Sequence, residues 1–205
     1  AHGEAGASLA AGDVATMLFT NNGAACLLAE GQRRRRWELA KTPETLTVDA
    51  HDGGVPGLAF SPDGSALASV GKDGRCMITH LATGTTLTVT APQPATPLQA
   101  VAYHPGGNYL ALGGWESGLQ IWDIKRQRQV ATPLANAQVW STTFSDDGAQ
   151  LAAAGKGGVW IWDFAPETSD DSTAPSTSET TSTPTTPFHQ LAHIEAGTIF
   201  HCAFA

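Results

Sequence analysis

The stretch LQAVAYHPGGNYLALGGWESGLQIWD, residues 98–123, consists of three short apolar segments separated by two polar, glycine-containing ones. The first polar segment, 104–107, contains a proline, which presets a backbone angle that turns use, and two glycines, which tolerate positive φ. The second, 116–118, again ends in glycine. Three short apolar segments joined by tight turns predict three antiparallel strands, the last of which ends at Trp122 and Asp123.

The same pattern occurs four times along the chain. An aromatic residue stands before the turn in each copy, and the start of a fifth copy lies near the C-terminus. These aromatic residues are Phe19, Phe60, Tyr103, Phe144 and Phe204, and the first three intervals between them are 41, 43 and 41 residues. The predicted turns after the first four are 20–23, 61–64, 104–107 and 145–148. A period of about 40–45 residues with four strands in each repeat is typical of a β-propeller.

With these motifs the chain resembles the WD-repeat β-propeller family. The residues that carry the resemblance are Phe60-Ser61-Pro62-Asp63-Gly64, Leu67-Ala68-Ser69, Trp122-Asp123 and Trp162-Asp163. The resemblance implies an all-β fold in which 1–13 are a lead-in and 14–205 form blades. The expected blades are 14–54, 55–97, 98–138 and 139–197, with 198–205 as the first strand of a fifth. We therefore expect part of a larger ring of about seven blades, completed by a longer chain or a second polypeptide.

The resemblance also implies a buried hydrogen-bonded set of His, Asp, Ser or Thr, and Trp in each blade. The second repeat supplies His51, Ser69 and Asp73, but Thr79 stands where Trp is expected. The third and fourth repeats have the Trp and the acid after it, without the full set; these residues are Trp122, Asp123, Trp162 and Asp163. We expect all seven to be structural and none to be catalytic, and we expect the blades to depend more on apolar packing than on polar networks.

Residues 165–187 interrupt the fourth repeat. Of these 23 residues, 13 are Ser or Thr, 4 are Pro and 4 are acidic. Such a composition buries too little apolar surface to offset the entropy of ordering, so the segment is predicted to be disordered. Two interpretations stay open: a surface loop without function, or a phosphorylation site at Thr183 and Thr186, each of which precedes a proline.

The only basic run is 33–36, four consecutive arginines. In the repeat alignment Arg34 and Arg36 stand where the other repeats have apolar residues. Side chains alternate between the faces of a strand, so two of the four arginines must face each way. The sequence leaves three interpretations: a poorly packed first blade, an acidic patch on a protein partner, or binding of phosphate or RNA.

In the family that this chain resembles, partners usually contact the narrow face of the ring. That face lies near the start of each first strand and near the residue before the acid of the turn. The resemblance implies Gln99 and Trp140 at strand starts, and Lys72, Trp115 and Lys156 on turns. Exposed tryptophans among polar residues suit an interaction hot spot. The alternative is that Trp115 and Trp140 fill gaps between blades.

The composition narrows the classes of partner. The formal net charge of −8 argues against nucleic acid and anionic membranes, because both carry charge of the same sign. No apolar run approaches the roughly 18–20 residues of a membrane span. Cys26, Cys76 and Cys202 lie in apolar patterns without metal-ligand spacing. This usage indicates buried free thiols in a reducing, intracellular and cytoplasmic setting.

The sequence contains no phosphate-binding glycine loop, no nucleophile elbow and no metal triad, so we expect neither an enzyme nor a cofactor. It favours a non-catalytic WD-repeat scaffold that binds protein partners within a larger complex. The alternative is a sensor or regulatory propeller domain of a longer signalling protein that contains a kinase or a nucleotide-dependent switch. An enzyme with its site in the propeller channel is a third possibility.

Overall fold

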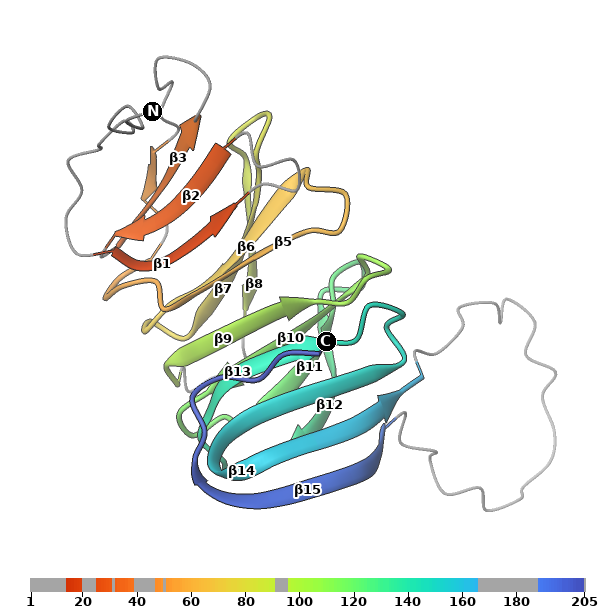
Figure 1. Ribbon diagram of the computed structural model, residues 1–205. Coiled ribbons are helices and arrows are strands. Elements are labelled where there is room, and N and C mark those ends of the chain that lie inside the picture. The colour runs from red at the N-terminus through yellow and green to blue at the C-terminus, as the bar shows by residue number, and fades with distance from the viewer. Residues whose placement is uncertain are drawn as a thin grey trace, which may run out of the picture.

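The computed structural model contains four antiparallel β-sheets and, in the residues that it describes, no helix (Figure 1). The described residues are 14–19, 25–30, 32–38, 47–49, 51–90, 96–165 and 188–204. For the strands up to residue 49, the structure describes the backbone and not the side chains. The turn predicted at 20–23, the lead-in 1–13 and nearly all of the insertion lie outside the described residues, so those predictions stay untested.

Each sheet is built from strands that follow one another in the chain. The first contains β1 (Val14–Phe19), β2 (Ala25–Glu30), β3 (Arg33–Glu38) and β4 (Thr47–Asp49). The second contains β5 (Gly57–Phe60), β6 (Ala66–Val70), β7 (Arg75–His80) and β8 (Thr86–Thr90). The third contains β9 (Leu98–Tyr103), β10 (Tyr109–Gly114), β11 (Leu119–Asp123) and β12 (Arg128–Leu134). The fourth contains β13 (Val139–Phe144), β14 (Gln150–Phe164) and β15 (Phe188–Thr198).

The turns between the first and second strands share one geometry. The N–H of the fourth residue donates to the carbonyl of the first, with N···O distances of 2.8 Å at 61–64, 2.8 Å at 104–107 and 2.9 Å at 145–148. The fourth residue is a glycine each time, with φ between 69° and 74°. Because only glycine adopts this conformation without strain, the repeated glycine explains why the sequence predicted these three turns.

The fourth sheet has three assigned strands, but the long strand β14 is bent and supplies two adjacent strand segments. A straight 15-residue strand would place its ends roughly 50 Å apart. Instead the N–H of Phe164 donates to the carbonyl of Ala149 at 2.8 Å, so β14 folds back on itself. The bend lies at the predicted turn 156–158, where Gly157 and Gly158 have φ of 106° and 138°. One arm pairs with β13 and the other with β15 (Figure 1).

The second, third and fourth sheets pack face to face in order, and the cores between them explain the apolar periodicity. β10 is buried along its whole length because its alternate residues face different neighbours. Leu110 and Leu112 pack toward the second sheet, together with Trp122. Tyr109 and Ala111 pack toward the fourth sheet, in the cluster that contains Trp162. Trp122 and Trp162 are 6% and 2% exposed.

The C-terminal segment 199–204 differs from the expectation of a strand. The structure assigns no strand to it, and β15 ends at Thr198. The physical reason is that a first strand pairs with the second strand of its own blade, and the described residues offer no such strand. The segment nevertheless follows the inner edge of the fourth sheet, because the N–H of Ile199 donates to the carbonyl of Gly155 at 3.1 Å.

The arginine run forms a strand despite its charge. β3 pairs with β2 at six consecutive positions, with Arg34 opposite Ala29 and Arg36 opposite Leu27. Arg34 also pairs with Val48 of β4. The backbone ladder covers all four arginines. The three interpretations of the run, a poorly packed first blade, an acidic patch on a protein partner and binding of phosphate or RNA, stay predictions.

Candidate functional site

The predicted partner-binding residues of the second to fourth sheets lie at one end of the strands. In each of these sheets the turn between the second and third strands lies beside the start of the first strand. The same hydrogen bond joins these two segments each time. The N–H of Lys72, Trp115 and Lys156 donates to the carbonyl of Gly54, Pro97 and Gln138, with N···O distances of 3.2, 3.1 and 3.0 Å.

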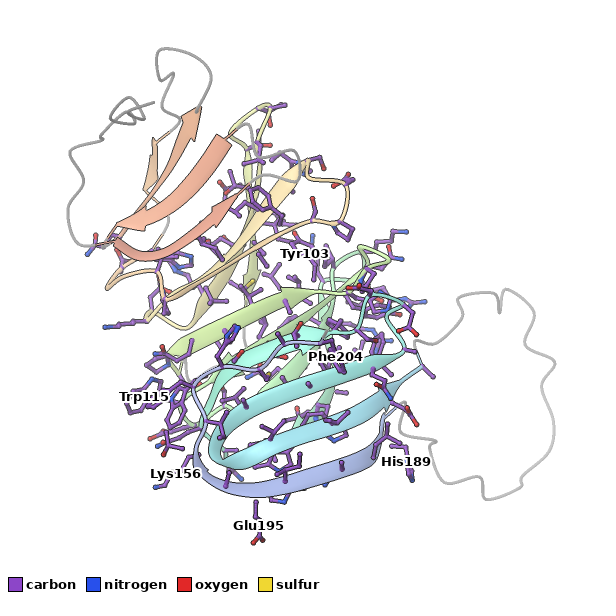
Figure 2. All side chains as sticks on the ribbon, viewed as in Figure 1. Tyr103, Trp115, Lys156, His189, Glu195 and Phe204 are labelled. Carbon is purple, nitrogen blue, oxygen red and sulfur yellow. The ribbon has the colours of Figure 1, made fainter. Side chains whose placement is uncertain are left out.

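Trp115 is unusually accessible for a tryptophan, and the side chains around it at this end are exposed or half-buried. Trp115 is 48% exposed, and Lys72 and Lys156 are also exposed. Gln99 is half-buried at the start of β9. Figure 2 shows Trp115 and Lys156 at the same end of the sheets, with Tyr103 and His189 toward the other end. We call this end the turn face and define it by Lys72, Gln99, Trp115, Trp140 and Lys156.

Trp140 does not stand alone on the turn face. Its ring stacks on Phe200, with ring centroids 5.1 Å apart and planes 22° from parallel. Trp140 is half-buried, whereas Phe200 is 73% exposed. Trp140 is therefore partly packed, which agrees with the alternative that it fills a gap between blades. It also forms the inner half of an exposed aromatic pair with Phe200. The sequence analysis missed Phe200, although Phe200 precedes Phe204 by the same interval that separates Trp140 from Phe144.

Neighbouring blades bring these residues side by side. The N–H of Leu98 donates to the carbonyl of Gly71 at 3.1 Å, which places Gln99 next to the turn that carries Lys72. The equivalent bond from Ile199 to Gly155 places Phe200 next to the turn that carries Lys156. Gly113 is packed against Val139, so a Cβ there would meet Val139 side-chain and backbone atoms. This contact lies at the junction between the third and fourth sheets. It places Trp115, two residues after Gly113, near Trp140, the residue after Val139.

The set His51, Ser69 and Asp73 lies directly beneath the turn face. His51 is 3% exposed, and its Nε2 lies 2.8 Å from Ser69 Oγ. Its Nδ1–H donates to Asp73 Oδ1 at 3.1 Å. A Cβ at Gly71 would clash with His51 Nδ1 and Asp73 Oδ1, so only glycine permits this approach. The set therefore shapes the turn that presents Lys72.

Asp73 is held as a carboxylate by its surroundings. Partial burial raises the pKa of Asp73, but hydrogen bonds from the N–H groups of Arg75 and Asp52 and from the Arg75 and His51 side chains outweigh it, so the pKa lies below its usual value. The backbone bonds are 3.0 and 2.9 Å long. Arg75 also bridges to Asp52 at 3.1 Å. All of these bonds serve to hold the turn.

The residues at the end of the third strand, where the family has Trp and Asp, form different hydrogen bonds in the second and third sheets. In the second sheet Thr79 Oγ1 lies 3.1 Å from Thr86 Oγ1, on the adjacent strand. In the third sheet the indole N–H of Trp122 donates to Gln120 Oε1 at 3.1 Å, a partner that the sequence analysis did not identify. Asp123 is buried and accepts hydrogen bonds from the N–H and the guanidinium of Arg126, at 2.9 and 3.0 Å.

Asp163 follows Trp162 as Asp123 follows Trp122, but it is exposed. Within the described residues, contacts that support a structural role of the acid in the Trp-Asp pair are found at Asp123.

The opposite end of the third and fourth sheets contains a half-buried imidazole, that of His104, for which the sequence predicted no role beyond the turn 104–107. The N–H of Gly106 donates to His104 Nδ1 at 2.9 Å, and His104 Nε2–H donates to the carbonyl of Gly148 at 3.2 Å. The ring also packs against Phe144 and Phe164, at centroid distances of 5.2 and 5.0 Å. Burial lowers the pKa of His104, although the bond to Gly148 acts in the opposite direction.

The described residues also bear on candidate metal ligands, on the cysteines and on membrane spans. No group of three or more His, Cys, Asp or Glu side chains there could hold a metal ion. Cys76 is buried, Cys202 is half-buried, and burial raises the pKa of the Cys202 thiol. That same part of the chain contains no helix that is long and apolar enough to span a membrane.

Comparison with known families matches three stretches of the chain. The family model described as "WD domain, G-beta repeat" matches residues 43–80, 85–123 and 128–163, which is more than half of the chain. Each match begins with the outer strand of one sheet and continues through the inner strands of the next. The first match thus contains β4 together with β5, β6 and β7.

Three relatives illustrate the similarity. Pre-mRNA-processing factor 19 homolog 2 of Arabidopsis thaliana is 31% identical over 120 residues, which are 58% of this chain and 23% of the relative. The LST8 homolog of Drosophila melanogaster is 27% identical over 59% of this chain and 39% of its own length. RACK1y, a small ribosomal subunit protein of Oryza sativa subsp. japonica, is 26% identical over 74% of this chain and 48% of its length.

The chain thus spans less than half the length of these curated relatives. Its repeated turns, its four antiparallel sheets and the three matched repeats agree with one another. The chain belongs to the WD40 family of G-beta repeat proteins.

Proposed function

We propose that this chain is a non-catalytic interaction module that binds a protein partner through the turn face. The observation that supports the proposal is Trp115, which is 48% exposed at a turn fixed by a backbone hydrogen bond. Tryptophan dominates binding energy at interfaces because it buries a large surface with few rotatable bonds. A rigid turn adds to this, since little further ordering is needed on binding.

The wider context of this function also belongs to the proposal. We propose that the partner is a protein, that nucleic acid is not a partner, and that further blades come from a longer chain or another polypeptide. The regulatory-domain alternative, the intracellular cytoplasmic location and the binding roles of Arg34 and Arg36 stay predictions. The absence of enzyme activity likewise stays a prediction.

A selection from a random peptide display library tests the proposal. The 205-residue chain is the bait, and peptides that it enriches are then measured against Trp115→Ala and Phe200→Ala. We expect each variant to weaken binding by about tenfold or more. Leu87→Ala is the control, because Leu87 is 37% exposed on the outer strand β8, away from the turn face. Peptides that bind all three variants equally, or no enrichment at all, would contradict the proposal.

A further inference from the structure

The five residues that define the turn face include two lysines and no acid, whereas the chain as a whole is acidic. The chain carries a formal net charge of −8, but two of the turn-face residues are the exposed lysines Lys72 and Lys156. Neither forms an ion pair with any residue in the described part of the chain. The nearby acid Asp52 is already bridged by Arg75, at 3.1 Å, and Glu116 is exposed on the Trp115 turn.

The order of the blades fixes the order of these groups. Lys72 lies on the second sheet, Trp115 on the third and Lys156 on the fourth. Trp140, at the start of the fourth sheet, extends the aromatic part from Trp115 toward Lys156, and its ring stacks on Phe200. A segment that crosses the three sheets in succession therefore meets a cation, an aromatic group and a second cation.

We propose that the turn face selects an extended partner segment in which carboxylates flank a central apolar or aromatic side chain; this inference rests on the proposed interaction function. The central side chain packs on Trp115 and on the Trp140–Phe200 pair, and the carboxylates approach Lys72 and Lys156. Packed sheets lie about 10 Å apart. An extended chain covers about 3.3 Å per residue, so the two carboxylates are about six residues apart.

The charges contribute selectivity more than affinity. An exposed ion pair stabilises a complex by about 0.2–1 kcal/mol, which is at most about a fivefold change in affinity for each lysine. The attraction also accelerates association and weakens as salt screens it. The aromatic contacts supply the larger part of the binding energy. The two contributions are therefore separable by experiment.

Two synthetic peptides, EESFSEE and KKSFSKK, provide the test with the 205-residue chain. Fluorescence anisotropy should show that the acidic peptide binds about tenfold or more tightly than its basic counterpart, and less tightly as salt is raised. The double substitution Lys72→Glu and Lys156→Glu should abolish this preference. The double substitution Lys125→Glu and Arg128→Glu is the control of matched charge, because both side chains are exposed at the opposite end of the third sheet.

The outcomes separate the inference from the function on which it rests. Equal binding of the two peptides, or an acidic preference that survives the double lysine substitution, overturns the inference. No measurable binding of EESFSEE at about 1 mM also overturns it. In either case the proposed function stands if library peptides still lose affinity with Trp115→Ala. If Trp115→Ala weakens neither library peptides nor EESFSEE, both proposals fail.

Discussion

The second and fourth sheets build the same turn with different chemistry. In the second sheet the turn at Gly71 closes over a buried imidazole, and the carboxylate of Asp73 accepts hydrogen bonds from His51 and Arg75. In the fourth sheet the equivalent bend has no acid, and the backbone reverses at Gly157 and Gly158, both of which have positive φ. The turn is therefore held by a polar network in the second sheet and by glycine conformation in the fourth.

This difference separates two sources of stability that usually occur together in a repeat. The fourth sheet depends on its apolar cluster, in which Leu151, Ala153, Trp160 and Trp162 are all less than 9% exposed. The second sheet adds to its own apolar cluster a buried polar set that must stay fully paired, because an unpaired buried group is costly. Apolar truncation should therefore be most harmful in the fourth sheet, and loss of a polar partner should matter only in the second.

The largest expected effect is that of Trp162→Ala. Trp162 is 2% exposed between the third and fourth sheets, so truncation should lower the free energy of unfolding by about 3–5 kcal/mol. Urea unfolding followed by circular dichroism measures the change. Trp115→Ala, at an exposed site, is the control and should cost less than about 1 kcal/mol. A cost below about 1 kcal/mol for Trp162→Ala would show that packing of this indole does not hold the fourth sheet.

The next effect contrasts two aspartates. Asp73→Ala removes the acceptor of the buried His51 and should cost about 1–3 kcal/mol. Asp163→Ala in the fourth sheet removes an exposed carboxylate and should change the free energy of unfolding by less than about 0.5 kcal/mol. Equal costs in the same urea experiment would mean that the polar network does not distinguish the two sheets.

A third effect depends on pH and concerns the contact between the third and fourth sheets. The folded pKa of His104 lies below its ordinary value of 6.5, so the unfolded chain binds the proton more readily. Stability should be full above about pH 6.5 and should fall as pH is lowered through the folded pKa. His104→Asn keeps an acceptor and a donor but does not titrate, so its urea midpoint should change less between about pH 7.5 and 5.5. A wild-type midpoint that rises on acidification would contradict this assignment.

The smallest effect compares two serines. Ser117 Oγ is buried and has no hydrogen-bond partner among the described residues, so Ser117→Ala should raise the free energy of unfolding by about 0.5–1 kcal/mol. Ser69→Ala removes the partner of His51 Nε2 and should lower it by about 1 kcal/mol. Thermal unfolding of the two variants beside the wild type resolves the opposite signs. A loss of stability in Ser117→Ala would indicate that its hydroxyl is paired in solution.

The fold could be predicted because its signals are local and repeated. Glycine at the fourth position of each turn and an apolar strand after it are visible in the sequence, and three such turns form as expected. The burial of Trp122 and Trp162 follows from the same register. Within 198–205, where the first strand of a fifth blade was expected, no strand is assigned at 199–204, because pairing needs a second strand, which a local pattern does not reveal.

The turn face could be predicted only in part. Its position came from the resemblance, but the stacking of Trp140 on Phe200 joins two repeats and has no signal within either one. The acceptor of the Trp122 indole is Gln120 on the same strand, a partner that the repeat pattern did not indicate. Long side chains can reach unexpected partners, so contacts of this kind need coordinates.

The offset between matched repeats and sheets has a consequence for a divided chain. A cut at Thr83 leaves β8 on the C-terminal fragment, although its five ladder pairs are with β7 on the other fragment. A cut at Asn136 falls between complete sheets and leaves only packed faces to join the pieces. Fragments divided within a sheet therefore carry a complementary strand edge, which makes the β7–β8 connection the better site for split-protein reassembly.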